Sequence, residues 1–313
     1  MVTKKAVVFL MGQTASGKSE AAMLLAQQLP GEIVNVDSAQ IYRYMDIGTA
    51  KPGIAERESV AHHLLDLRDP HESYSAAQFC LDAHEVIEAI FARGNVPILV
   101  GGTGLYFRAL EQGLAPLPPA NPDVRARILG QAQTLGWQAL HRQLCEIDPE
   151  SAQRIHHNDA QRIQRALEVY YASGETLSQF WKRETSSKFL YPVIKCAIRW
   201  QDKMQLWQRI ERRFNAMVSE GLIDEVVDLR ARFPVTAEHA SMRAVGYRQV
   251  WRFLDGEIER NEVAQQGVFA TRQYAKRQLT WLRKEEDLFW FSGGTKGLEK
   301  AILSHILSKL ANL

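Results

Sequence analysis

Apolar residues follow two distinct patterns along the 313-residue chain, continuous runs and helical periodicity. Continuous apolar runs at 6–11, 32–36 and 96–100 predict strands that are buried on both faces. Helical stretches separate them, at 20–29 and at 75–93, where Phe79, Ala83, Ile87 and Ile90 share one helix face and Gly94 ends the pattern. This β-α-β rhythm predicts a parallel sheet covered by helices.

A proline-rich stretch at 114–122 divides the chain, because prolines interrupt regular structure. From residue 123 to about 188 the pattern is helical and contains no strand candidate. A strand pattern returns at 193–199, and another follows at 288–291. Helices are expected at 202–219, 221–232, 247–253, 262–284 and 298–310. We therefore predict an α/β core formed by residues 1–116 and 191–313, with an all-helical domain inserted at 117–190.

A phosphate-binding loop follows the first predicted strand. Its sequence, Gly12-Gln13-Thr14-Ala15-Ser16-Gly17-Lys18-Ser19, matches G-x-x-x-x-G-K-[ST] and opens the first helix. In this context the backbone N–H groups wrap a polyphosphate, Lys18 supplies a positive charge, and the Ser19 hydroxyl suits Mg²⁺. The core is thus predicted to be P-loop NTPase-like. The loop indicates a polyphosphate ligand but does not identify the reaction.

Composition and charge narrow the class of protein. Apolar residues make up 46% and charged residues 24% of the chain, and the formal net charge of +2 is too small to indicate a nucleic-acid partner by itself. Three widely spaced cysteines, Cys80, Cys145 and Cys196, fit neither a disulfide framework nor a C-x-x-C zinc site. With no signal peptide or membrane-spanning run in the sequence, we expect a cytoplasmic protein.

Polar residues follow two further strands at the same predicted sheet edge. Asp37 ends the second strand, and Thr103 lies in Gly101-Gly102-Thr103-Gly104 after the next. Ligands of open α/β sheets bind at the carboxyl ends of the strands, so both should face the phosphate loop. Asp37 is either a general base or a strand-end cap or Mg²⁺-associated carboxylate. The glycine-rich segment is either part of the site or simply a turn.

Basic residues gather in four segments of the second half. Arg209, Arg212 and Arg213 share one predicted helix, from which one of them could reach the phosphates. The stretch 270–284 carries five cations and no acid, and 161–165 and 243–248 add further basic segments. Solvated helix faces would explain each segment alone, whereas the last three segments together favour an RNA partner. The adjacent pair His62-His63, predicted to lie in a loop, lacks the spacing of a helical zinc pair and is not expected to bind metal.

Taken together, these motifs resemble the bacterial tRNA dimethylallyltransferase family, whose members prenylate N6 of adenosine 37. The resemblance covers nearly the whole chain and rests on G-Q-T-A-S-G-K-S at 12–19, D-S-A-Q-I-Y at 37–42, M-D-I-G-T-A-K-P at 45–52, G-G-T-G-L-Y at 101–106, H-x-N-D-x-Q-R at 157–162, R-A-V-G-Y-R at 243–248 and K-R-Q-L-T-W-L-R at 276–283. Gln13 and Ala61 stand where the family usually has proline. The zinc finger of eukaryotic members is missing.

The resemblance implies residue roles. Residues 12–19 would hold the diphosphate of dimethylallyl diphosphate, Asp37 would accept the proton from the adenosine amine, and Lys18, Arg213, Thr103 and Ser19-bound Mg²⁺ would complete the catalytic site. Arg213 rather than Arg212 is chosen by resemblance alone. The tRNA contacts would be Asp37, Ser38, Ala39, Gln40, Thr103, Arg125, Gln161, Arg162, Ile163, Gln164, Arg165, Arg243, Ala244, Val245, Gly246, Tyr247, Arg248, Lys276, Arg277, Gln278, Leu279, Thr280, Trp281, Leu282 and Arg283.

The predicted function is therefore transfer of a dimethylallyl group to adenosine 37 by a monomer, with the helical insertion gripping the anticodon stem-loop and the target base flipped into the site. The partners are tRNA and dimethylallyl diphosphate, without a membrane. One alternative is an ATP-dependent small-molecule kinase, which leaves the insertion and the basic segments unexplained. The other is an RNA-binding module whose phosphate loop only gates binding.

Overall fold

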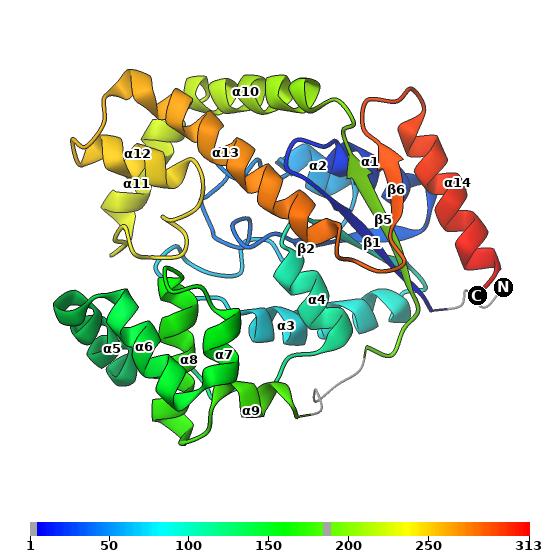
Figure 1. The fold of residues 1–313 in the computed structure, drawn as a ribbon. Helices are drawn as coiled ribbons and strands as arrows, with labels where there is room; N and C mark the ends of the chain where they lie inside the picture. The colour runs from blue at the N-terminus through cyan, green and yellow to red at the C-terminus, as the bar shows by residue number, and fades with distance from the viewer. Residues whose placement is uncertain (1–4, 184–188) are drawn as a thin grey trace. The chain divides into compact units, whose positions relative to one another are not determined.

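The computed structural model describes residues 5–183 and 189–313, and a six-stranded parallel sheet forms the centre of its larger compact unit (Figure 1). The strands lie in the order β3-β2-β4-β1-β5-β6. In register, Phe9 of β1 lies between Leu99 of β4 and Lys195 of β5. The strand bounds are β1 Val7–Gly12, β2 Gly31–Val36, β3 His62–His63, β4 Val96–Gly101, β5 Val193–Arg199 and β6 Phe289–Ser292. The five predicted strands are confirmed to within one residue at each end.

Helices cover both faces of the sheet because successive strand residues point to opposite sides. Val8 and Leu10 pack with α1 (Lys18–Gln28) and α14 (Leu298–Ala311), which lie side by side (Figure 1). Phe9 points to the other face, where its ring contacts Phe107 of α4 (Gly104–Gln112). That face also contacts α3 (Ala76–Ala92) and α13 (Arg260–Leu282). The helices α1 and α14 therefore cover one face, and the long helix α13 lies on the other.

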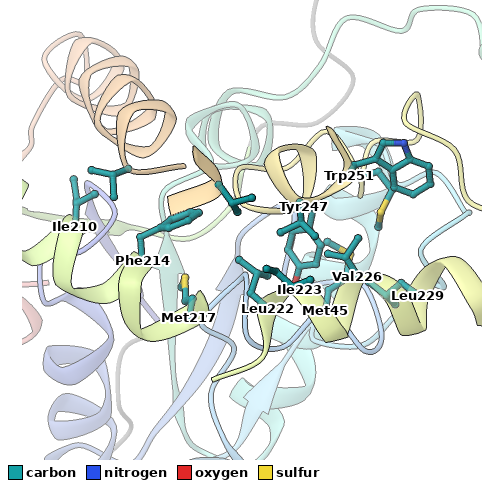
Figure 2. Packing of buried hydrophobic residues seen from close by; sticks show 14 of the residues in the cluster. Met45, Ile210, Phe214, Met217, Leu222, Ile223, Val226, Leu229, Tyr247 and Trp251 are labelled. Carbon is teal, nitrogen blue, oxygen red and sulfur yellow. The ribbon is translucent and has the colours of Figure 1, made fainter. Parts of the chain in front are cut away.

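A second hydrophobic cluster packs α13 against three further helices. These are α10 (Lys203–Ser219), α11 (Leu222–Arg232) and α12 (Tyr247–Leu254). Figure 2 shows the buried side chains of this cluster, among them Phe214 of α10, Leu222 of α11 and Tyr247 of α12. Burial of each such side chain stabilises the fold by about 1.5–3 kcal/mol. The cluster holds α10 and α13 in contact, and both helices reach the phosphate loop.

Gly267 of α13 packs directly against the Phe214 ring of α10. A β-carbon at Gly267 would lie 1.9 Å from the Phe214 ring, whereas one at Gly130, in another helix, would meet nothing within 4 Å. We expect Gly267→Ala to lower the free energy of unfolding by about 1–3 kcal/mol through overpacking. Gly130→Ala, the matched control, should raise it by about 0.5–1 kcal/mol because alanine favours the helix. Urea unfolding of both variants tests this; equal stability would contradict the tight crossing.

Residues Glu111–Phe189 form a second compact unit, and Met1–Leu110 with Leu190–Leu313 form the first. The described part of the second unit is all helical, with its own core around Leu140, Leu144 and Leu167. Residues 184–188, part of the predicted insertion at 117–190, lie outside the described residues. The helices are α5 Pro122–Leu135, α6 Trp137–Ile147, α7 Pro149–Arg154, α8 Ala160–Ser173 and α9 Leu177–Trp181.

Two short elements differ from the sequence prediction. His62 and His63 form the edge strand β3, paired with Ile33 and Val34, and not a loop. The helix α2 (Ile54–Ser59) was not predicted, because six residues are too few for a clear periodicity. His63 contacts Glu32 at 2.6 Å, and His62 contacts the Val60 carbonyl. Among the described helices, none has the length and apolar character to cross a membrane.

Candidate active site

The phosphate loop occupies the turn between β1 and α1. Gly17 has φ = 96°, a conformation that suits glycine, and α1 begins at the next residue. A β-carbon at Gly12 would lie 2.7 Å from the Ser16 hydroxyl oxygen, so only glycine allows the loop to fold back this tightly. The first N–H groups of α1 have no partner within the helix and attract anions.

Two cations line one pocket with this loop. Lys18 starts α1, and Arg213 reaches the pocket from α10, where its guanidinium donates to the Thr14 hydroxyl. Burial, followed by the nearby charge of Arg213, lowers the pKa of Lys18 to about 8. Burial also lowers the pKa of Arg213, opposed by the negative charges of Asp37 and Glu20. Two positive groups held this closely favour binding of a multiply charged anion.

The three arginines of α10 do not all point in the same direction around the helix axis. Arg213 is half-buried in the pocket, whereas Arg212 is exposed and donates to the Gln208 carbonyl of its own helix. Arg209, four residues before Arg213, donates to the Ala15 carbonyl at 3.0 Å and so contacts the loop as well. Sequence reasoning considered Arg209 only as one of the three. Its i, i+4 spacing from Arg213 was the signal that placed both on the loop side.

Asp37 and Thr103 are neighbours at the carboxyl ends of β2 and β4. The Thr103 hydroxyl accepts from the Ser38 N–H at 3.1 Å, and the Thr103 N–H donates to the Val36 carbonyl. The Asp37 carboxylate accepts from the Ala39 N–H at 2.9 Å, which leaves its second oxygen for a ligand. A β-carbon at Gly101 would lie 2.0 Å from the Val36 carbonyl oxygen, so glycine there brings the two strand ends together.

Charged and apolar side chains line the same pocket. Lys18, Arg213, Asp37 and Glu56 carry the charges, and Met23, Leu65 and Val100 are among the apolar residues. Carbon surface therefore lies within the same cavity as the anion site. Such a pocket suits a small molecule with an anionic head and a short apolar tail.

A loop at residues 45–51 forms another wall of the pocket through Thr49 and Ala50. The Glu225 carboxylate of α11 accepts from three successive N–H groups of this loop, at Asp46 (3.0 Å), Ile47 (2.7 Å) and Gly48 (3.2 Å). It also accepts from the Tyr247 hydroxyl. From the other side, the Gln40 amide donates to the Thr49 and Ala50 carbonyls. The wall is thus held in place before any ligand binds. Sequence reasoning missed Glu225, since nothing near it in sequence marks the contact.

Tyr274 of α13 is a further residue that the motifs did not single out. Its hydroxyl lies beside Thr103 and Gln278. Burial, followed by the negative charge of Asp37, raises its pKa well above the ordinary range. The phenol therefore stays protonated, beside Thr103 and near Asp37.

The predicted tRNA contacts divide into exposed and buried residues. Tyr247 is fully buried, Gln278 is 5% exposed, and Ile163, Gly246 and Leu282 are also buried. The exposed cations among the predicted contacts are Arg125, Arg162, Arg243, Arg248, Lys276, Arg277 and Arg283. These exposed cations are the members whose charges can reach a phosphate backbone.

In the second unit, two of the predicted contacts share an internal partner. Arg125 and Arg165 both pair with the buried Glu168 carboxylate, at 3.2 Å each. Burial alone would raise the pKa of Glu168, but the Asn121 N–H and the two arginines hold it below its ordinary value. The carboxylate thus fixes both guanidinium groups between α5 and α8.

Comparisons with known proteins identify the family of the chain. The family model described as IPP transferase matches residues 40–285. The chain is 52% identical over 287 residues to the tRNA dimethylallyltransferase of Nitrosococcus oceani, covering 92% of this chain and 91% of the relative. The full-length tRNA isopentenylpyrophosphate transferase of Bacillus halodurans superposes with a TM-score of 0.73 at 36% identity, covering 99% and 98% of the two chains. A eukaryotic dimethylallyltransferase that acts on tRNA superposes with a TM-score of 0.81 at 27% identity, covering 98% and 80%. The chain belongs to the IPP transferase family.

Proposed function

We propose that the chain transfers a dimethylallyl group from dimethylallyl diphosphate to N6 of adenosine 37 in tRNA and releases diphosphate. The observation that carries this proposal is one pocket that joins an anion cradle, a carboxylate and an apolar wall. The alternative, an ATP-dependent kinase, would need no apolar wall for a carbon tail. The relatives reported above are named as transferases of a prenyl group to tRNA.

The phosphate loop holds the diphosphate of the donor. Backbone N–H groups at the start of α1 and the charges of Lys18 and Arg213 bind its oxygens. As the allylic carbon–oxygen bond breaks, its electron pair leaves with the diphosphate, and negative charge grows there. Fixed cations and N–H groups stabilise such charge without reorganising.

Asp37 acts on the adenosine amine. The N6 atom forms a bond to the allylic carbon and must lose one proton, which passes to the free oxygen of the Asp37 carboxylate. Thr103 holds the Ser38 N–H and so keeps the backbone beside Asp37 in place. The new bond is carbon–nitrogen, the broken bond is carbon–oxygen, and the proton ends on Asp37.

Mg²⁺ fits this pocket as a partner of the donor. In the described part of the chain, no three His, Cys, Asp or Glu side chains form a metal site of their own. Mg²⁺ typically takes one or two protein oxygens and completes its shell with phosphate oxygens and water. The Ser19 hydroxyl, exposed in the same pocket, would supply one ligand. The ion would add positive charge to the departing diphosphate.

The exposed cations provide the tRNA surface, and the helical unit grips the anticodon stem-loop. Adenosine 37 leaves the anticodon stack to reach Asp37. Cys80, Cys145 and Cys196 are unpaired thiols, which fits a reducing cytoplasm. We expect the enzyme to act there as a monomer.

One assay tests the proposed function. The protein is incubated with unmodified tRNA and Mg²⁺, together with either dimethylallyl diphosphate labelled in the prenyl group or ATP labelled in the γ-phosphate. We expect label from the prenyl donor on adenosine 37 and none transferred from ATP. Phosphate transfer to a small molecule would support the kinase, and tRNA binding without transfer would support a binding module.

The tRNA affinity should fall steeply with salt. Each phosphate contact that releases a counterion contributes roughly −0.7 to −0.9 to the slope of log K against log salt concentration. Lys276→Gln should therefore reduce that slope by about 1. Lys300→Gln, on the exposed surface of α14, serves as the matched control and should leave the slope unchanged. Filter binding at several salt concentrations measures both; a flat response in the unaltered protein would exclude an electrostatic RNA surface.

A further inference from the structure

Gln278 connects two parts of the active site that are far apart in sequence. Its side-chain oxygen accepts from the Thr14 N–H of the phosphate loop at 2.7 Å, across 264 residues of chain. Its side-chain nitrogen donates to the Gly102 carbonyl, after β4, at 3.1 Å. We propose that Gln278 is a positioning residue that sets the donor's phosphate loop against the Thr103 side of the site, where the adenosine reacts. This inference rests on the proposed function.

The two partners fix which way the amide points. Thr14 offers a donor and Gly102 offers an acceptor, so the oxygen of the Gln278 amide faces Thr14 and its nitrogen faces Gly102. Both bonds are buried, and a buried polar group without a partner is costly. The Gln278 amide can therefore bind both backbone segments. A carboxylate in its place would put a negative oxygen against the Gly102 carbonyl oxygen, and the two would repel each other.

Close packing leaves little freedom for this arrangement. A β-carbon at Gly102 would lie 2.0 Å from the Gln278 side-chain nitrogen, so the segment after β4 approaches the amide as closely as glycine allows. One turn earlier on α13, the Ala275 carbonyl accepts from the Gln13 side chain at 2.9 Å. Two successive loop residues are thus tied to one helix, and the N–H of Thr14 is occupied by Gln278.

The same helix reaches the acceptor side. The Tyr274 side chain of α13 lies beside both Gln278 and Thr103. Thr103 in turn accepts from the Ser38 N–H, next to Asp37. Gln278 therefore links the phosphate loop to Gly102, and the next residue in the chain, Thr103, is hydrogen-bonded beside Asp37. Loss of Gln278 would let the loop and the reacting carboxylate move relative to each other.

Two substitutions test the role. Gln278→Met keeps the length of the side chain and removes both hydrogen bonds, and we expect kcat for prenyl transfer to fall on the order of 10²-fold, the scale of a misplaced reacting group. Gln278→Glu can donate to the Gly102 carbonyl only when it is protonated. Its kcat relative to the unaltered enzyme should therefore rise as pH falls, whereas the ratio for Gln278→Met should stay constant.

Three measurements separate positioning from other roles. Filter binding should give both variants the tRNA affinity of the unaltered enzyme, because Gln278 is buried. Gln265→Met, on the exposed surface of α13, is the matched control and should retain full kcat. Circular dichroism identifies any variant that fails to fold; the pH dependence of Gln278→Glu is then measured on the folded one.

Three outcomes would overturn the proposal. These are a kcat of folded Gln278→Met within threefold of the unaltered enzyme, a loss confined to tRNA affinity, and a flat pH ratio for Gln278→Glu. The unaltered enzyme shows whether the role of Gln278 or the proposed function is wrong, because it must transfer the prenyl group in the same assay. If it does not, the proposed function itself is wrong.

Discussion

Asp37→Asn should lower kcat for prenyl transfer by about 10²–10⁴-fold, the usual contribution of a general base. Asparagine keeps the size of the side chain and can still accept the Ala39 N–H, so the strand end should remain in place. It cannot take the proton that N6 of adenosine must lose. Single-turnover transfer with both substrates saturating measures this step, and filter binding should show tRNA affinity close to that of the unaltered enzyme.

Asp228→Asn is the control for this substitution. Asp228 is exposed on α11 and has only a distant ion pair, 3.8 Å from Arg232. The same chemical change there should leave transfer unaffected. Transfer by Asp37→Asn at the normal rate would show that another group, or water, accepts the proton.

Lys18→Met should reduce kcat/KM for dimethylallyl diphosphate by about 10²–10³-fold, as expected when one charged donor to a developing anion is removed. The pH dependence gives a sharper test. Burial and the charge of Arg213 lower the pKa of Lys18 to about 8 in the protein without donor, from an ordinary 10.5. The diphosphate binds the protonated form. The kcat/KM for the donor should therefore be constant below about pH 8 and fall towards tenfold per pH unit above it.

Lys18→Arg separates charge from geometry. Arginine stays protonated throughout this range, so the decline above about pH 8 should disappear even if the activity is lower. If Lys18→Arg declines with the same midpoint, another group titrates. Measurements across pH 6.5–9.5, with tRNA saturating, distinguish the two.

The sequence predicted the parts of the fold that local patterns specify. The phosphate loop needs a buried strand before it and a helix after it, and apolar runs bounded by glycine made both visible. The strand ends at Asp37 and Thr103 followed from the rule that ligands bind at the carboxyl edge of a parallel sheet. Both residues lie within a few ångströms of the same backbone segment, as the Thr103–Ser38 hydrogen bond shows. Their catalytic roles remain predictions.

Contacts between distant segments could not be predicted in this way. Glu225 receives three N–H groups from a loop 177–179 residues earlier in the chain, and neither segment carries a signal of the other. The choice between Arg212 and Arg213 depends on the rotation of α10 about its axis, which is set by the burial of Phe214 and its neighbours. The two-residue strand β3 is held by its pairing with β2 and has no periodicity to detect.

The path of the chain has a consequence for its synthesis. The central strand β1 has β5 as one neighbour, and the phosphate loop docks on Ala275 and Gln278. Residues 12–19 therefore leave the ribosome before Ala275 and Gln278 have been synthesised. At about 5–20 residues per second, the delay is on the order of 10–50 s. During translation the nascent loop has the sequence of a diphosphate site without its geometry. The proposed donor site is therefore complete only in an almost finished polypeptide.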